Sequence, residues 1–441
     1  MTKKIHVVVK VDVLMMTIIK LMAIKDNSFE NLKQKMLNWA NQFNIFCLLD
    51  NNHYSFEDAS FECMLGVGCA RAYTFNGDND LEALQKFHDQ NPSWLFGHLG
   101  YNAAGNSYVK NKQVDLNFGN GFLFEPETII KLSSNKIEVL KSNKNAEVLI
   151  AEIENTELLS FEESIALQIK PLITKAQYIA TINKLKEHIK RGDCYEVNFC
   201  QHFVLENTII HPINVYRKLT ELSPAPFGAL YKLNNNYCLC ASPERFLQKK
   251  GTQIISQPIK GTSKRDIDPL KDEANKKHLT TSTKEKSENV MVVDLVRNDM
   301  SMVCKKGSVS VKELFAVHSF PQVHQLISTI KGTLEGGRKF TDAIVACFPM
   351  GSMTGAPKKR VMELIEEYEF SPRGLFSGSI GYITPAGDFD FNVVIRSVFY
   401  NENNKEASFF AGSGITFHSD PEEEYEECML KANALIKVLT T

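Results

Sequence analysis

The chain has 441 residues, enough to bury a large core in two or three folding units or in one composite unit. It carries 50 lysine and arginine residues against 52 aspartate and glutamate residues, a formal net charge of −2, which gives no support for binding to nucleic acid or to an anionic membrane. A hydrophobic content of 43% with 23% charged residues is typical of a globular protein in water.

The first apolar stretch, residues 5–24, predicts buried strands. Lys10, Asp12 and Lys20 interrupt it, and each of these charges is costly inside a bilayer. The stretch also lacks the small-residue cleavage site of a signal peptide. The ten cysteines have no paired metal-ligand spacing, so we expect reduced thiols and a cytoplasmic location.

The first third of the chain predicts alternating strands and helix. Strand character falls on four segments: 6–14, 43–49, 63–70 and 94–100. Helical spacing places Leu32, Met36 and Trp39 on one face of residues 29–43. Residues 110–165 are rich in Asn, Lys, Ser and Glu, which predicts edge strands at 129–132 and 136–140 and a connecting segment.

The pattern changes after Pro171. Thr174 is a suitable N-cap for a helix that ends near Gly192, with Tyr178, Ile182, Leu185 and Ile189 forming its apolar stripe. Strands are predicted at 194–203, 229–233 and 237–241. Because side chains alternate along a strand, Cys238 and Cys240 should share one face of the last of these.

Residues 258–262, Pro-Ile-Lys-Gly-Thr, predict a strand running into a tight bend that holds Lys260 on rigid backbone. A lone Lys-Gly would be an ordinary surface pair. The proline before Lys260 and the glycine and threonine after it favour a catalytic lysine as the working hypothesis.

Two predicted helices carry paired carboxylates. Glu285 and Glu288 lie one turn apart in residues 282–303, and Glu424 and Glu427 lie one turn apart in a helix that begins after residues 419–421. Either pair alone could be a solvated acidic face. Together, oxygen donors without His or Cys would suit Mg²⁺ better than zinc.

Three later features could meet an anion. The turn at residues 351–360 feeds a helix N-terminus, which offers backbone N–H groups to a carboxylate or phosphate, although an ordinary capped helix is an equal alternative. Adjoining strands are predicted at 378–383 and 391–400, which places Arg396 inside an apolar strand, where its partner would be a protein carboxylate or a ligand. Small residues at 411–414 allow close approach of backbone to a ligand.

The chain from about residue 170 to 441 resembles the chorismate-utilising enzymes. The resemblance rests on ordered motifs at 192–198, 242–246, 258–262, 288–299, 351–358 and 424–431. It implies an α+β fold of large antiparallel sheets packed on each other with helices outside. It also divides the chain into an N-terminal region, 1–165, similar to the variable half of anthranilate synthase component I, and a chorismate-binding catalytic region, 166–441.

The resemblance implies the site residues. Catalytic roles fall to Lys260, Glu244 and His324, substrate contacts to Arg396, Thr354, Gly355, Gly412 and Thr262, and Mg²⁺ ligation to Glu288, Glu427, Glu285 and Glu424. A neutral Lys260 would attack C2 of chorismate while Glu244 protonates the departing C4 hydroxyl, and ammonia would then take C4. For His324, a core histidine bonded to backbone is the alternative.

Lys260 is the residue that distinguishes the branches of the family. The branch that aminates C4 for folate synthesis has lysine there, whereas the branch that makes anthranilate has alanine. At position 196 the chain has glutamate where the amination branch usually has glutamine, and Phe376 replaces a common tyrosine. We expect ammonia from a separate glutamine amidotransferase subunit. The alternatives are C2 amination and a chorismate-binding scaffold without activity.

Overall fold

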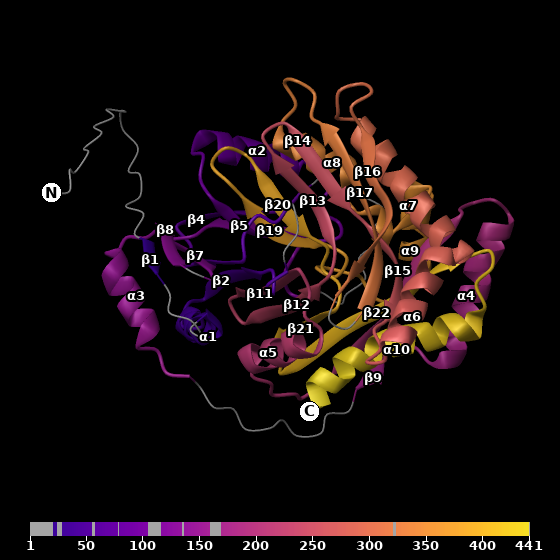
Figure 1. Ribbon diagram of the computed structural model, residues 1–441, viewed down its shortest axis with the longest axis horizontal. Helices are drawn as coiled ribbons and strands as arrows, with labels where there is room; N and C mark the ends of the chain where they lie inside the picture. Colours follow the sequence, from indigo (N-terminus) through magenta and orange to yellow (C-terminus); the bar gives the residue numbers. More distant parts are fainter. Residues whose placement is uncertain are drawn as a thin grey trace.

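The structure is a computed structural model that describes residues 21–23, 29–54, 58–77, 79–104, 116–134, 136–158, 169–320 and 323–440. Two large antiparallel sheets form its centre, and the helices lie around the outside (Figure 1). This is the α+β architecture that the sequence predicts. The strand predicted at 6–14 lies outside the described residues.

The larger sheet, here called sheet A, has twelve strands. Across the sheet they are β1 (Leu21–Ala23), β8 (Lys136–Lys141), β7 (Thr128–Ser133), β3 (Cys63–Val67), β2 (Ile45–Asp50), β11 (Phe227–Leu233), β12 (Asn236–Ser242), β21 (Ser397–Asn401), β22 (Glu406–Thr416), β10 (Glu196–Leu205) and β18 (Gly355–Ala356), with β9 (Lys170–Pro171) also beside β10.

The second sheet, sheet B, has ten strands. Across the sheet they are β15 (Ile259–Lys264), β17 (Val323–Thr333), β14 (Gln253–Gln257), β13 (Arg245–Lys250), β20 (Phe389–Asn392), β19 (Ser379–Ile383), β5 (Leu95–Leu99), β6 (Gly121–Glu125) and β4 (Arg71–Thr74), with β16 (Ser310–Ser319) also beside β17. Strands from both sides of residue 165 occur in each sheet, because β2 pairs with β11 and β5 pairs with β19.

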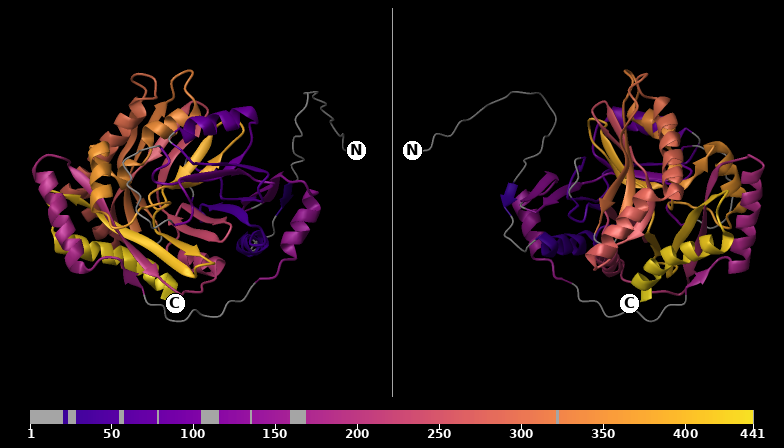
Figure 2. Two further views of the ribbon diagram at one scale, coloured as in Figure 1. Left: turned by 180° about the vertical axis from the view of Figure 1, so that it is seen from behind. Right: turned by 45° about the vertical axis from the view of Figure 1, so that its right-hand side comes forward.

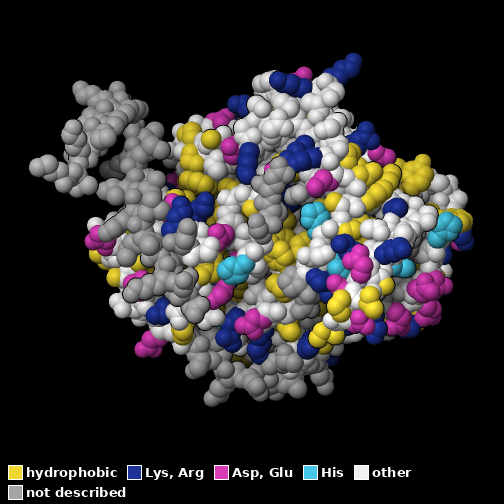
Figure 3. Space-filling view, in the orientation of Figure 1, with side chains coloured by type: hydrophobic (Ala, Val, Ile, Leu, Met, Phe, Trp, Pro, Cys, Tyr) yellow, Lys and Arg dark blue, Asp and Glu magenta, His cyan; other side chains and the backbone are white. Residues whose placement is uncertain are grey.

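Ten α-helices and one 3₁₀ turn are described in these ranges. They are α1 (Phe29–Ala40), α2 (Asp80–Gln90), α3 (Ala146–Glu154), α4 (Lys175–Lys190), α5 (Pro212–Leu222), α6 (Pro269–Thr281), α7 (Thr283–Ser301), α8 (Phe340–Cys347), η1 (Gly351–Met353), α9 (Lys358–Tyr368) and α10 (Pro421–Thr440). None of the described helices is long and apolar enough to cross a bilayer. On the face in Figure 3, acidic and basic side chains are interspersed.

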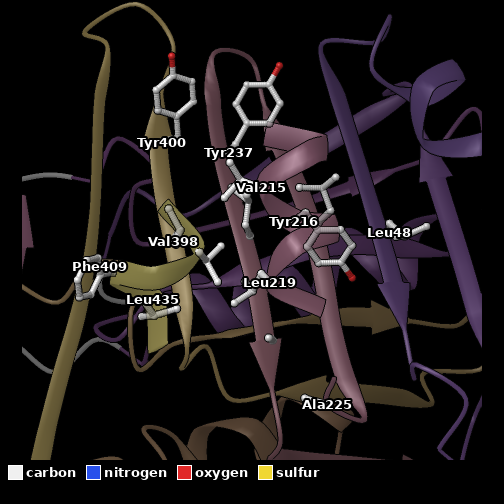
Figure 4. Close-up of a cluster of buried hydrophobic side chains, with 14 of the residues drawn as sticks. Leu48, Val215, Tyr216, Leu219, Ala225, Tyr237, Val398, Tyr400, Phe409 and Leu435 are labelled. Carbon is white, nitrogen blue, oxygen red and sulfur yellow. The ribbon is translucent and has the colours of Figure 1, made fainter. Parts of the chain in front are cut away.

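Strand alternation separates two cores. In β2, Phe46 and Leu48 face one core while Cys47 and Leu49 face the other, as the two-residue period of a strand requires. The first core joins sheet A to α1, α3, α4, α5, α9 and α10 (Figures 2 and 4), and the second includes α2, α7, α8 and the side chains of sheet B. Sheet A therefore has apolar side chains on both faces.

The helix predictions are confirmed where the period and the caps agree. In α1, Leu32, Met36 and Trp39 are buried. In α4, Thr174 forms a capping box with Gln177, and the predicted stripe is buried. The prediction for residues 110–165 missed α3, a helix of nine residues within the segment rich in Asn, Lys, Ser and Glu.

The prediction of a single strand over 391–400 is wrong. Residues 389–392 belong to sheet B and residues 397–401 to sheet A, so the chain crosses between the sheets at Val393 to Arg396. Arg396 has a φ of 50°, in the left-handed region, which ends strand geometry there. A run of apolar residues predicts burial but does not show which sheet buries it.

A second crossing lies directly beside the first. Between β12 of sheet A and β13 of sheet B the chain passes through Pro243 and Glu244. The Val393 N–H donates to the Glu244 carbonyl (3.0 Å), and the Ala241 N–H donates to the Arg396 carbonyl (3.2 Å). The two crossings therefore hold Glu244 and Arg396 in one region between the sheets.

Arg245 fixes the start of β13. Its side chain is fully buried and forms two bonds with the Asp390 carboxylate on β20, at 2.9 and 3.0 Å. It also donates to Gln257 on β14 and to the Asp58 carbonyl. A bidentate pair of this kind holds the backbone that carries Glu244.

Replacing Arg245 with methionine should lower the free energy of unfolding by about 3–5 kcal/mol, because Asp390 would remain buried without its cation. The matched control is Lys86→Met, which removes one partner of the exposed Glu82–Lys86 pair and should change the stability by less than about 0.5 kcal/mol. Urea denaturation followed by circular dichroism measures both. Equal stability of the two variants would contradict the structural role of Arg245.

Candidate active site

Lys260 lies on β15, at the edge of sheet B. Between Ile259 and Thr262 the register with β17 shifts, and Gly261 has a φ of +93°, so the bend predicted at 258–262 is a bulge within a strand. A Cβ on Gly261 would lie 2.8 Å from Glu285 Oε2 of α7. The bulge requires glycine, and it brings Lys260 under an acidic helix.

Lys260 is not a surface residue. Its Nζ lies 2.5 Å from Glu196 Oε1, and the two side chains are 12% and 2% exposed. Glu196 begins β10, so the ion pair links the edge of sheet B to sheet A. Burial alone would lower the pKa of Lys260, but the attraction of Glu196 and Glu288 raises that pKa well above its usual range. The amine is therefore protonated here, whereas the proposed attack needs it neutral.

Glu244 has the opposite electrostatics. It is buried at the sheet crossing, accepts a hydrogen bond from Ser352 Oγ (2.6 Å), and accepts another from the Ile259 N–H beside Lys260. Burial raises the pKa of Glu244 to about 7, and the Ser352 bond and the Lys260 charge oppose part of that rise. A carboxyl that titrates near neutrality can serve as a general acid.

Arg396 presents a charge at the neighbouring crossing, between β20 and β21. Burial lowers its pKa, while Glu244 and Tyr54 act in the opposite direction. Within the part of the chain that the structure describes, no carboxylate forms an ion pair with Arg396. The Glu244 carboxylate acts on Arg396 electrostatically, and a ligand anion as the partner of Arg396 stays a prediction.

The predicted anion turn packs against β10. The Thr354 N–H and hydroxyl both donate within the turn, to Gly351 and Met350 carbonyls. A Cβ on Gly355 would lie 2.0 Å from the Glu196 carbonyl, and one on Gly412 would lie 2.1 Å from the Phe199 carbonyl. These glycines are explained by close strand contacts, and their substrate contacts stay predictions.

Two other predicted site residues have different surroundings. Thr262 is exposed on β15. His324 is buried on β17, with Nδ1 2.8 Å from Ser319 Oγ and Nε2 3.1 Å from Asp272 Oδ1. Both ring nitrogens of His324 thus have side-chain partners. The catalytic role of His324 stays a prediction.

The acidic pairs lie on α7 and α10, as predicted. Glu285 faces Gly261, and Glu288 acts on Lys260 electrostatically, which places the α7 pair beside the lysine. On α10, Glu424 is buried and Glu427 pairs with Lys431 at 2.7 Å. The oxygen donors suit Mg²⁺ chemically. Among the described side chains, however, no three acidic, histidine or cysteine residues are gathered closely enough to hold a metal ion.

The sequence did not identify the residues that set the protonation of the site. Glu196 was noted only as a departure from glutamine, and its pairing with Lys260 spans 64 residues of sequence. Ser352 lies in the predicted turn, and nothing in the motif shows that its hydroxyl reaches Glu244 across 108 residues. The available signal for both was a polar side chain inside an otherwise buried segment, Glu196 at the start of β10 and Ser352 in η1.

The chain is similar to known proteins over most of its length. Residues 47–437 match the chorismate binding enzyme family. The chain is 39% identical over 267 residues to aminodeoxychorismate synthase component 1 of Escherichia coli strain K12, covering 60% of this chain and 58% of the relative. The component 1 of Bacillus subtilis strain 168 is 34% identical over 304 residues, covering 67% and 64%. The chain thus spans less than two thirds of these relatives.

Solved structures show the same fold. Anthranilate synthase component I from Streptococcus pneumoniae TIGR4 superposes with a TM-score of 0.74 at 24% identity, covering 87% of this chain and 93% of that one. The menaquinone-specific isochorismate synthase of Escherichia coli gives 0.76 at 18% identity, covering 96% and 94%. At these identities the likeness establishes the fold, which agrees with the predicted architecture.

The Glu244 carboxyl should titrate near pH 7, and Ser352→Ala should raise its pKa by roughly 1 pH unit, because the lost hydrogen bond stabilises the charged form. Infrared difference spectra of the protonated carboxyl stretch measure this, with Glu244→Gln to assign the band. Ser308→Ala, which removes a hydroxyl bonded to the Lys305 carbonyl, is the control. An unchanged midpoint in Ser352→Ala would contradict the contact.

Proposed function

Because the chain belongs to the chorismate binding enzyme family, we propose that it aminates chorismate at C4 to give 4-amino-4-deoxychorismate for folate synthesis. Curated relatives that carry the name aminodeoxychorismate synthase support this assignment, since their identities to this chain reach 34–42%. The observation that carries the proposal is the placement of the Lys260 amine beside a carboxyl that titrates near neutrality.

The proposed reaction uses these two groups in turn. Lys260 attacks C2 and forms a C–N bond as both ring double bonds shift and the C4–O bond breaks. Glu244 gives its proton to the departing hydroxyl, which leaves as water. Ammonia then attacks C4, both double bonds shift back, and the C2–N bond to Lys260 breaks. The Ile259 N–H bond to Glu244 supports this assignment, because it keeps the acid next to the nucleophile.

Arg396 is the proposed partner of a substrate carboxylate. Chorismate carries two carboxylates, and a half-buried guanidinium at the sheet crossing is a suitable bidentate donor. Its place beside Glu244 supports binding on the side of the ring that carries the enolpyruvyl group.

Mg²⁺ is the proposed cofactor. When bound, it would neutralise the ring carboxylate and withdraw electron density from the ring. Glu285 and Glu288 on α7, beside Lys260, and Glu424 and Glu427 on α10 are the candidate donors. Their carboxylate oxygens support this assignment, because Mg²⁺ prefers oxygen ligands. Glu427 would have to give up its ion pair with Lys431 in order to bind the ion.

We propose that a separate glutamine amidotransferase subunit supplies the ammonia. The component 1 names of the bacterial relatives support a partner component.

A cytoplasmic location is likewise a proposal. It is supported by the ten cysteines, all of which are free thiols, as expected in a reducing compartment.

Incubation with chorismate, Mg²⁺ and an ammonium salt should give a C4-aminated product, identified by mass and fluorescence. Lys260→Ala should lower its formation by on the order of 10⁴-fold or more, because the covalent route is lost. Lys264→Ala, an exposed lysine on the same strand, is the control and should retain activity. Chelation of divalent ions should also stop turnover.

Two outcomes would overturn the proposal. Anthranilate as the main product would assign the chain to the alternative C2 reaction, which a lysine at position 260 disfavours. No turnover by any variant, with chorismate still bound, would favour a chorismate-binding scaffold.

A further inference from the structure

We propose that Glu196 is the proton acceptor for Lys260: its carboxylate takes the ammonium proton before the amine attacks and returns it when the amine is expelled. This inference rests on the proposed C4 amination. It assigns a proton-transfer role to a residue where glutamine is usual in the amination branch.

The geometry of the pair is the first observation. Lys260 Nζ and Glu196 Oε1 are 2.5 Å apart, a separation at which a proton can move between them without passing through water. Both side chains are nearly buried, so the pair exchanges poorly with solvent. Lys260 rests protonated in this contact, so the proton that it must lose before attack has Glu196 as its nearest acceptor.

The second observation is the unused oxygen of the same carboxylate. Glu196 Oε2 is buried, and among the described groups it has no hydrogen-bond partner. A buried carboxylate oxygen without a donor is costly, so this charge is poorly stabilised on its second oxygen. Lys260 Nζ is therefore the hydrogen-bond partner of this buried carboxylate, which leaves Oε2 without a competing donor among the described groups.

The third observation is the space made for the pair. A Cβ on Gly414, on β22 beside β10, would lie 2.5 Å from Glu196 Oε1 and 3.0 Å from Lys260 Nζ. Glycine at this position therefore leaves room for the two side chains to meet. Within the small-residue segment 411–414, Gly414 is thus the residue that serves the Glu196–Lys260 contact.

The proton balance of the cycle is complete. One Nζ–H proton passes to Glu196 Oε1, and the freed electron pair forms the C2–N bond. The attached nitrogen, now a secondary ammonium, becomes a neutral amine again when the C2–N bond breaks and its electrons return to nitrogen. Glu196 then gives back its proton. Glu244 separately supplies the proton that leaves with the C4 oxygen, and the ammonium that forms when ammonia attacks C4 returns a proton to Glu244.

Glu196→Gln is a test that keeps the shape and removes the acceptor. At pH 7 its rate should be about 100-fold below that of the unaltered protein, because the amine must then lose its proton to solvent. The ratio of the two rates should recover by about tenfold per pH unit between pH 7 and 9. Free ammonia is held constant and saturating at each pH, and melting curves confirm that the variant is folded.

Glu196→Asp keeps a carboxylate on a shorter side chain. It should lower the rate, yet its ratio to the unaltered protein should not change with pH. A role for Glu196 in packing alone would instead give both variants a constant ratio. That result for Glu196→Gln would overturn the proposal.

A second measurement does not depend on turnover. Acetylation of Lys260 by acetic anhydride at pH 8, followed by peptide mass analysis, should be at least about tenfold faster in Glu196→Gln, because the amine is no longer held protonated. Lys264 provides the internal reference. Equal acetylation of Lys260 in both proteins would overturn the proposal. Failure of C4 amination alone, with faster acetylation, would instead overturn the proposed function.

Discussion

The ion pair between Lys260 and Glu196 is the contact on which the site depends. It joins an edge strand of one sheet to a strand of the other, so it forms only if the two sheets meet correctly. Two glycines make it possible: Gly261 lets β15 bulge toward α7, and Gly414 leaves room for both side chains. A single short contact therefore depends on the register of three strands, which explains how a flexible lysine is held in one place.

The acid and the arginine come together for a different reason. Glu244 and Arg396 each lie where the chain crosses from one sheet to the other, and backbone hydrogen bonds tie the two crossings together. At a crossing, the side chain is buried between sheets but the backbone is irregular, so a polar group can be held there without interrupting a ladder. Buried Arg245, bound to Asp390, fixes the strand that follows Glu244.

Much of this fold follows from local pattern. Helices α1 and α4 were predictable because their apolar period and, in α4, the Thr174 cap agree, and the acidic pairs of α7 and α10 were correctly placed on helices. The single strand over 391–400 was wrong because apolar residues are buried equally well by either sheet. Family motifs indicated Lys260, Glu244 and Arg396. The charge on Lys260 was not predictable, because Glu196 is 64 residues away in sequence.

Burial disfavours the charged form of both side chains, so it raises the pKa of Glu244 and acts to lower that of Lys260. Both groups nevertheless hold a proton near neutral pH, for different reasons. Glu244 keeps its proton because its contacts with Ser352 and the Ile259 N–H are too weak to offset burial, whereas Lys260 keeps its proton because a carboxylate touches it. The proposed amination at C4 needs Glu244 to hold its proton until the C4–O bond breaks and Lys260 to lose its proton before it attacks. A base in solution would remove the proton of Glu244 first, because the pKa of Glu244 is about 7 and that of Lys260 is well above its usual range. A base already in contact with Nζ acts on the lysine alone, so the same contact that holds the amine inert also provides the way to activate it.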